Sequence, residues 1–171
     1  IGDEAVVVVN AGQAQMEADV LTAIRELSDR PIEYIIDTSA DADDVSGSAA
    51  LSKSGFANSG QPGEPAGAGI VAQLNTLNQL VRSPIEGAAF PTDSYEDQWS
   101  FFNNEPVIVT HAPAAHSSGD SYVFFRRSDV ISTGGLFDTG HYPVIEADQG
   151  GSIDGIIDAL NDIIGIMVPR E

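Results

Sequence analysis

The feature that most constrains the fold is a run of apolar, mostly β-branched residues near the start of the chain, Ala5–Val9. Such an uninterrupted run is typical of a strand buried on both faces, because an exposed face would show alternating polar residues. Residues 10–12 follow as a turn, and apolar residues then recur at helical spacing from Gln13 to Ser28. Pro31 ends this helix, and a second short strand covers Ile32–Ile36. The opening order of strand, helix and strand predicts a layered α/β fold.

The remaining segments extend this pattern. We expect helices at Ser48–Ser52 and Ile70–Arg82, and a closing helix that Ser152 caps. The strands that we expect are Val107–Thr110, Ser121–Phe125 and Asp129–Ser132. The segments that we expect to be irregular are the Asp-rich loop Ser39–Asp44, the Gly-rich loop Ser54–Gly69, and Pro84–Asp97.

The charge balance limits the possible partners. The 171 residues include 26 acidic and 7 basic side chains, which gives a net charge of −19. A surface of this charge repels phosphate backbones and anionic headgroups, so we expect neither a nucleic-acid partner nor direct membrane insertion. The charge favours cationic partners and an extracytoplasmic setting, periplasmic or extracellular, although a solvated surface is the ordinary reading of such an excess. Cysteine is absent, which excludes disulfides and thiolate sites.

Four segments, in this order, resemble the metallo-β-lactamase superfamily. Val6–Gly12 is similar to the family's strand that ends in Asp-x-Gly, and Tyr34–Asp44 stands where the family carries His-x-His-x-Asp-His. Pro113–Ser121 is similar to the loop that bears the family's next histidine, and Ser132–Phe137 is similar to its Thr-Gly-Asp turn. The tail from Tyr142 to Gly155 is typical of one bacterial branch.

The resemblance implies the family's fold, a four-layer αββα sandwich with metal ions at one edge of the two sheets. It covers nearly all of residues 1–171, which we expect to form a single metallo-β-lactamase-like domain. The family's chains are longer, with opening strands and a final histidine-bearing segment that have no counterpart here. The resemblance therefore implies a fragment, a processed chain, or the ordered part of a longer chain.

The family's reaction needs one or two zinc or iron ions, which polarise the substrate and lower the pKa of bound water. Aligned residue by residue, the ligand positions that keep the family's residue are Asp43 and His116. One imidazole and one carboxylate do not make the family's tetrahedral site, so we expect no bound metal, no other cofactor and no catalytic residues. The ligand positions that lack the family's residue are those of Ser39, Asp41, Asp44 and Gly135, and Asn10 replaces the aspartate that supports the family's site from behind.

Two alternatives for metal binding stay open at this point. Asp41, Asp43 and Asp44 offer hard oxygen ligands that suit a divalent cation such as Ca²⁺ or Mg²⁺, although their spacing does not match an EF-hand loop and a solvated acidic loop is the ordinary alternative. His111 and His116 could form a two-histidine pair. Against that pair, we expect His116 to be partly buried and hydrogen-bonded.

Three functions follow from these observations. The leading one is a non-catalytic protein of metallo-β-lactamase fold, a pseudoenzyme that serves as a structural or interaction subunit, with other subunits or its own copies as partners. The alternatives are a divergent metal-dependent hydrolase that uses Asp41, Asp43 and Asp44 with His116, and a binding protein that keeps the cleft for a small ligand. Aromatic side chains support an interface, although they could equally cover the core. They are Phe90, Tyr95, Trp99, Phe101 and Phe102.

Overall fold

The computed structural model, which describes residues 1–55 and 67–167, contains two four-stranded sheets. The first sheet is parallel, in the spatial order β1 (Val6–Val9), β2 (Ile32–Asp37), β3 (Gly69–Gln73) and β4 (Asp93–Tyr95). The second sheet is antiparallel, in the order β5 (Gln98–Phe102), β6 (Pro106–His111), β7 (Ser121–Phe125) and β8 (Val130–Ser132). Each sheet therefore comes from one continuous part of the chain.

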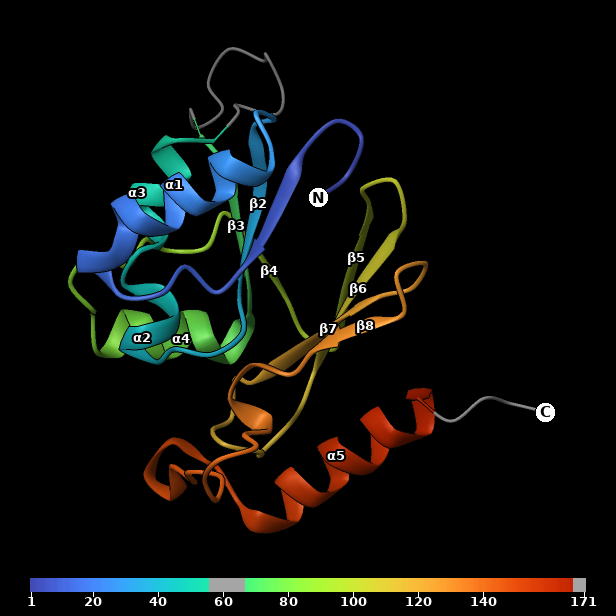
Figure 1. Cartoon of the computed structure of the whole chain (residues 1–171). Coiled ribbons are helices and arrows are strands. Elements are labelled where there is room, and N and C mark those ends of the chain that lie inside the picture. The colour runs from blue at the N-terminus through green and yellow to red at the C-terminus, as the bar shows by residue number, and fades with distance from the viewer. Residues whose placement is uncertain (56–66, 168–171) are drawn as a thin grey trace.

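Helices lie outside both sheets, which gives the four-layer αββα order expected from the resemblance (Figure 1). On the side of the first sheet lie α1 (Glu17–Leu27), α2 (Ala42–Val45), α3 (Ser48–Lys53) and α4 (Leu74–Arg82). On the side of the second sheet lies α5 (Ile153–Met167). Ser152 caps its first turn, since the N–H of Gly155 donates a hydrogen bond to Ser152 Oγ (3.0 Å).

Three separate apolar clusters join these four layers. One lies between α1, α3 and the first sheet and includes Val6, Ile35 and Leu51. A second fills the space between the two sheets, and a third holds α5 against the second sheet. The members of the second include Ile36, Val71, Val109 and Val123, and those of the third include Tyr122, Leu136, Ile156 and Ile163.

The β1 run packs on both faces, as its sequence predicts, but the strand lies at the edge of its sheet. Val6 and Val8 face the helices, and Val7 and Val9 face the second sheet. Because no strand pairs with the outer edge of β1 among the described residues, Val7, Val8 and Val9 are only half-buried. The sequence therefore indicated which faces are covered and not the place of the strand in the sheet.

The helix expected at Ile70–Arg82 is wrong over its first residues. Residues 69–73 form β3, which pairs with β2 in parallel, and the helix begins only at Leu74. The side chain of Gln73 accepts a hydrogen bond from the N–H of Asn75 and so caps the start of α4. Strand pairing on both sides of β3 outweighs a helical period that the short apolar run also satisfies.

The segment expected to be irregular, Pro84–Asp97, contains β4, and β5 follows it directly. Tyr95 is buried between the sheets, while the rings of Trp99 and Phe101 pack against Tyr34 with centroids 5.0 and 4.8 Å away. Tyr95, Trp99 and Phe101 therefore belong to the core between the sheets. Phe90 and Phe102 stay exposed.

Two loop predictions have mixed outcomes. The Asp-rich loop Ser39–Asp44 runs into α2, a single helical turn that starts at Ala42. Most of the Gly-rich segment Ser54–Gly69 lies outside the described residues. No helix within residues 1–55 and 67–167 is both long and apolar enough to cross a membrane.

Candidate functional site

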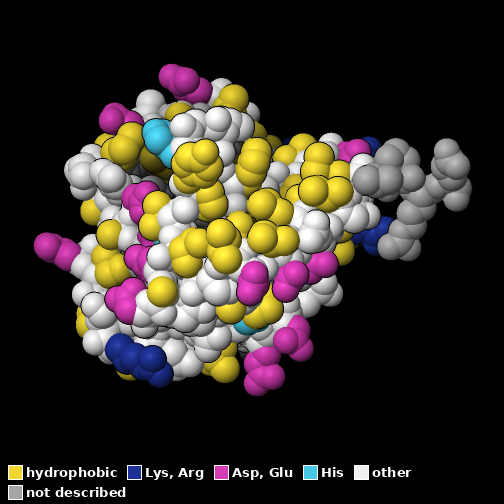
Figure 2. Space-filling model, turned by 90° about the horizontal axis from the view of Figure 1, so that it is seen from below, with side chains coloured by type: hydrophobic (Ala, Val, Ile, Leu, Met, Phe, Trp, Pro, Cys, Tyr) yellow, Lys and Arg dark blue, Asp and Glu magenta, His cyan; other side chains and the backbone are white. Residues whose placement is uncertain are grey.

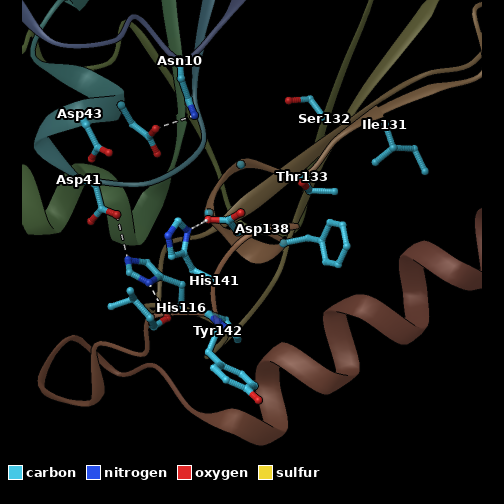
Figure 3. A pocket seen from close by; sticks show the side chains of 16 residues that line it. Asn10, Asp41, Asp43, His116, Ile131, Ser132, Thr133, Asp138, His141 and Tyr142 are labelled. Carbon is cyan, nitrogen blue, oxygen red and sulfur yellow. Dashed lines mark hydrogen bonds and ion pairs between the residues drawn. The ribbon is translucent and has the colours of Figure 1, made fainter.

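Loops that follow β1, β2, β6 and β8 surround a pocket of about 760 Å³ (Figure 3). The carboxyl ends of β1 and β2 meet at one edge because the two strands are parallel. The lining brings together most of the residues singled out in the sequence: Asn10, Asp41, Asp43, Asp44, His116 and Gly135.

A hydrogen-bond network ties the end of β1 to the Asp-rich segment. Asn10 donates from Nδ2 to Asp44 Oδ1 (2.8 Å), and its Oδ1 accepts from the N–H (2.9 Å) and the hydroxyl (3.0 Å) of Thr38. Ser39 Oγ donates to the other carboxylate oxygen of Asp44 (2.7 Å) and accepts from the N–H of Asp41 (2.9 Å). Both oxygens of Asp44 therefore have donors from the protein itself. Ser39 and Asp44, which stand where the resemblance implies histidines, are hydrogen-bonded to each other.

Burial raises the pKa of the Asp44 carboxyl to about 6, although the hydrogen bond from Ser39 lowers it. The nearby carboxylates of Asp43 and Asp41 raise it further, and His116 opposes them. At neutral pH the carboxylate is still charged, and it is held by two uncharged donors. Uncharged donors of the network therefore satisfy both oxygens of Asp44, and neither donor carries a positive charge.

This shift predicts how stability depends on pH. The pKa of Asp44 is about 6 in the folded chain against a model value of 3.8, so the folded state holds an extra proton between these two values. The contribution of Asp44 to the free energy of unfolding should therefore fall by about 2 kcal/mol as pH rises from about 4 to about 6. Urea unfolding of the wild type and of Asp44→Asn across this range measures the effect. Parallel curves for the two proteins would contradict it.

His116 is buried, and both of its ring nitrogens face the protein. Nδ1 lies 2.9 Å from the carbonyl oxygen of Val144 and must donate to it, because a carbonyl only accepts. Nε2 lies 2.9 Å from Asp41 Oδ2, within ion-pair distance, but this contact lacks the direction of a hydrogen bond and Nε2 has no other partner among the described residues. The close contact with the Asp41 carboxylate raises the pKa of His116 to about 9, although burial of the ring lowers it. The hydrogen bond to Val144 and the charge of Asp41 raise the pKa further. At neutral pH the His116 ring is therefore protonated and forms an ion pair with Asp41.

Glu146 joins this pair and was missed by the sequence interpretation. One ligand atom from each of Asp41, His116 and Glu146 lies within 4.8 Å of the other two. Burial and the charge of Asp41 raise the pKa of the Glu146 carboxyl. Glu146 lies in the tail segment that resembles one bacterial branch, but no spacing in the sequence relates it to His116.

Gly135 lines the pocket, and a Cβ atom built there would have no described atom within 4 Å. Packing around the Cβ position therefore does not require glycine here. At the preceding residue the opposite holds. A Cβ on Gly134, which has φ of 53°, would lie 2.4 Å from Thr38 Oγ1.

The other candidate residues lie apart from this contact. Asp43 is exposed on the pocket wall, and the Asp41, Asp43 and Asp44 carboxylates do not form one ligand group among the described residues. His111 Nε2 lies 2.9 Å from the carbonyl oxygen of Ser118, so the two-histidine pair with His116 is not formed. As a result, Asp41 is the one member of the proposed Asp cluster that meets His116.

Comparisons with known proteins now identify the fold. No protein-family model and no curated protein matches the sequence. Among solved structures, a metallo-β-lactamase from Pontibacter korlensis matches with a TM-score of 0.77 at 14% identity, over 96% of this chain and 71% of that chain. The chain has the metallo-β-lactamase fold.

Two further metallo-β-lactamases match over 96% of this chain. They are IND-7, with a TM-score of 0.70 at 16% identity over 70% of its length, and DIM-1 exposed to ceftazidime, with 0.69 at 12% over 68%. The expectation of this fold from four short segments is confirmed. Identities this low show the fold alone.

The residues present do not fit the zinc positions that the metallo-β-lactamase fold implies. Ser39 and Asp44 are occupied by each other, Asn10 donates where the resemblance implies a carboxylate, and Gly135 has no side chain. The structure instead brings together a different set of possible metal ligands, the imidazole of His116 and the carboxylates of Asp41 and Glu146. That the chain binds no metal therefore stays a prediction, and these three residues are where it can be tested.

Proposed function

We propose that this chain is a non-catalytic protein of metallo-β-lactamase fold that serves as a structural or interaction subunit of a larger assembly. The observation that carries the proposal is the closed network of Asn10, Thr38, Ser39 and Asp44. A catalytic metal site keeps its donors available to the ion and its substrate. Here the protein has turned two ligand positions into internal hydrogen-bond partners.

An exposed apolar surface supports the interaction part of the proposal. Figure 2 shows hydrophobic side chains gathered on the face seen from below, with acidic side chains at several places around them. A groove of about 540 Å³ lies there between the β8 region and α5, lined mostly by apolar residues such as Ile131, Phe137 and Leu160. Contiguous apolar surface of this kind is typical of a docking site. Large apolar residues of this region that are exposed are Val130, Phe137, Ile157, Ile164 and Met167.

The catalytic half of the proposal is tested by turnover. Wild type and His116→Ala are assayed with Zn²⁺, Mn²⁺ or Fe²⁺ against a chromogenic β-lactam, an aryl phosphodiester and a thioester. We expect both proteins to give the rate of the metal solution alone. Metal-dependent turnover by the wild type that His116→Ala loses would refute the proposal.

The interaction half is tested by photo-crosslinking in the native host. A photoreactive residue at Ile157 on α5 should give discrete crosslinked species, whereas one at Leu27 on α1, which is also exposed, should not. Equal crosslinking at both positions, or none at either, would contradict a subunit role for this surface.

A metal-dependent hydrolase is the second candidate, and one observation favours it. Asp41 and His116 both line the 760 Å³ pocket, and Asp43 lies exposed on the same wall. A cation bound there would supply a water of lowered pKa. The turnover assay above distinguishes this candidate from the first.

A further inference from the structure

We propose that Asp41, His116 and Glu146 bind one divalent cation. Asp41 and His116 stand at two of the ligand positions that the resemblance implies, and Glu146 is a ligand that the resemblance does not include. The proposal concerns binding and not turnover, so it is independent of the non-catalytic function proposed above. The cation would join the Asp-rich segment after β2 to the segment that precedes α5.

The distances suit a single ion. Asp41 Oδ2 and His116 Nε2 lie 2.9 Å apart. Two neighbouring ligands of an ion with bonds of about 2.1 Å lie roughly 3 Å apart in octahedral geometry. The Glu146 oxygen lies within 4.8 Å of both atoms, so its partly exposed side chain needs to approach by about 1–2 Å to complete the group.

The orientation of His116 is that of a metal ligand. Nδ1 donates to the Val144 carbonyl (2.9 Å), so the second nitrogen, Nε2, presents a lone pair once the ring gives up its Nε2 proton. Metal-binding histidines commonly hold their other N–H in this way. His116 is only 5% exposed, and Nε2 has no hydrogen bond among the described residues. This buried nitrogen, which has the Asp41 carboxylate beside it and no well-directed hydrogen bond, points to a ligand in a way that the carboxylates alone do not.

The backbone fixes Glu146 next to His116. The N–H of Glu146 donates to the His116 carbonyl (2.8 Å), and the Glu146 carbonyl accepts from the N–H groups of Gln149 and Gly151 (both 2.9 Å). Only the side chain of Glu146 therefore has to move when a cation binds. Glu146 and Asp41 also line a second pocket, of about 320 Å³, which is open to an entering ion.

The charges and donor types define the class of ion. Two carboxylates and one neutral imidazole match a divalent cation, and one nitrogen with two oxygens suits Mn²⁺, Fe²⁺ or Zn²⁺ better than Ca²⁺, which prefers oxygen alone. Arg82 lines the pocket beside Asp41 and Glu146, but the structure shows no ion pair from it to either carboxylate within residues 1–55 and 67–167. The proton that His116 carries without a cation would be released on binding.

The test is calorimetric titration of the chelator-treated chain with Mn²⁺ and with Zn²⁺ at about 0.15 M salt, where screening weakens adventitious binding to exposed acids. We expect one saturable equivalent in the wild type and a loss of affinity of at least about 10-fold in Glu146→Gln. The matched control is Asp148→Asn, which removes one charge from the same loop and no proposed ligand. It should change affinity less than about 3-fold.

The proposal is overturned if the wild type shows no saturable equivalent of either metal. It is also overturned if Glu146→Gln binds like the wild type, or if Asp148→Asn loses as much affinity as Glu146→Gln, because binding would then follow general charge. Arg82→Gln separates a competing guanidinium from a cation site: tighter binding in this variant agrees with the proposal. One equivalent without turnover supports both proposals, and one equivalent with turnover refutes only the non-catalytic function.

Discussion

Replacing Gly155 by alanine should separate α5 from the second sheet and lower the free energy of unfolding by about 3 kcal/mol or more. Gly155 is buried in the first turn of α5 against the loop that leads to His116. A Cβ atom there would lie 1.9 Å from the Ala114 carbonyl oxygen and 2.4 Å from its carbon. Because the obstacle is backbone, no side-chain rotation relieves the overlap, and the helix has to move away. Urea unfolding followed by circular dichroism measures the loss.

The same helix supplies the matched control. Gly165 lies in the exposed part of α5, and a Cβ atom there would have no described atom within 4 Å. Gly165→Ala should therefore stabilise the chain by up to about 1 kcal/mol, since alanine favours a helix over glycine. If Gly155→Ala were as stable as Gly165→Ala, the close packing of α5 on the loop at Ala114 would be refuted.

The order of elements was predictable from the sequence because long periodic segments carry it. The run at β1, the period of α1 and the isoleucines of α5 each bury a face large enough to show in the pattern. β4 has three residues and β3 leads directly into α4, so neither shows an alternation of its own. Their identity as strands depends on pairing with a neighbouring strand, which local sequence does not reveal.

The site was predictable only in part, for a related reason. The resemblance indicated which positions had lost their family residue, and the structure brings Ser39, Asp41, Asp44, His116 and Gly135 to one edge of the sheets. It could not show that Ser39 and Asp44 bind each other, because this depends on side-chain direction in a turn. Glu146 was invisible, since it meets His116 through a loop whose path the sequence does not specify.

The second large effect is expected from Asn10→Asp, which should lower the free energy of unfolding by about 3 kcal/mol at pH 8. Asn10 acts as a donor to Asp44 and as an acceptor from Thr38, and an ionised carboxylate can only accept. The substitution places two carboxylates at the 2.8 Å contact, where their negative charges repel each other and no proton lies between them. The penalty applies while both are charged. It should shrink as the pH falls toward the Asp44 pKa of about 6 and below, where the pair shares a proton.

A control separates this electrostatic effect from backbone strain. Asn104 also has a positive φ, of 61° against 60° for Asn10, and it is exposed in the turn between β5 and β6. Asn104→Asp makes the same side-chain change in the same backbone conformation without a carboxylate opposite it in a buried contact. It should alter stability by less than about 0.5 kcal/mol. A loss equal to that of Asn10→Asp would assign the effect to the backbone.

The double variant Asn10→Asp with Asp44→His is the decisive case, because it reverses one hydrogen bond. Residue 10 then accepts where it now donates, and residue 44 donates where it now accepts. The resemblance implies a carboxylate at position 10 and a histidine at position 44, whereas this chain has an amide and a carboxylate joined by a hydrogen bond of 2.8 Å. If the two replacements compensate each other, the imidazole N–H should donate to the new carboxylate, and the double variant should regain about 2 kcal/mol over Asn10→Asp at pH 8. A double-mutant cycle by urea unfolding measures that coupling. Simple additivity of the two losses would mean that the residues at positions 10 and 44 do not depend on each other for stability.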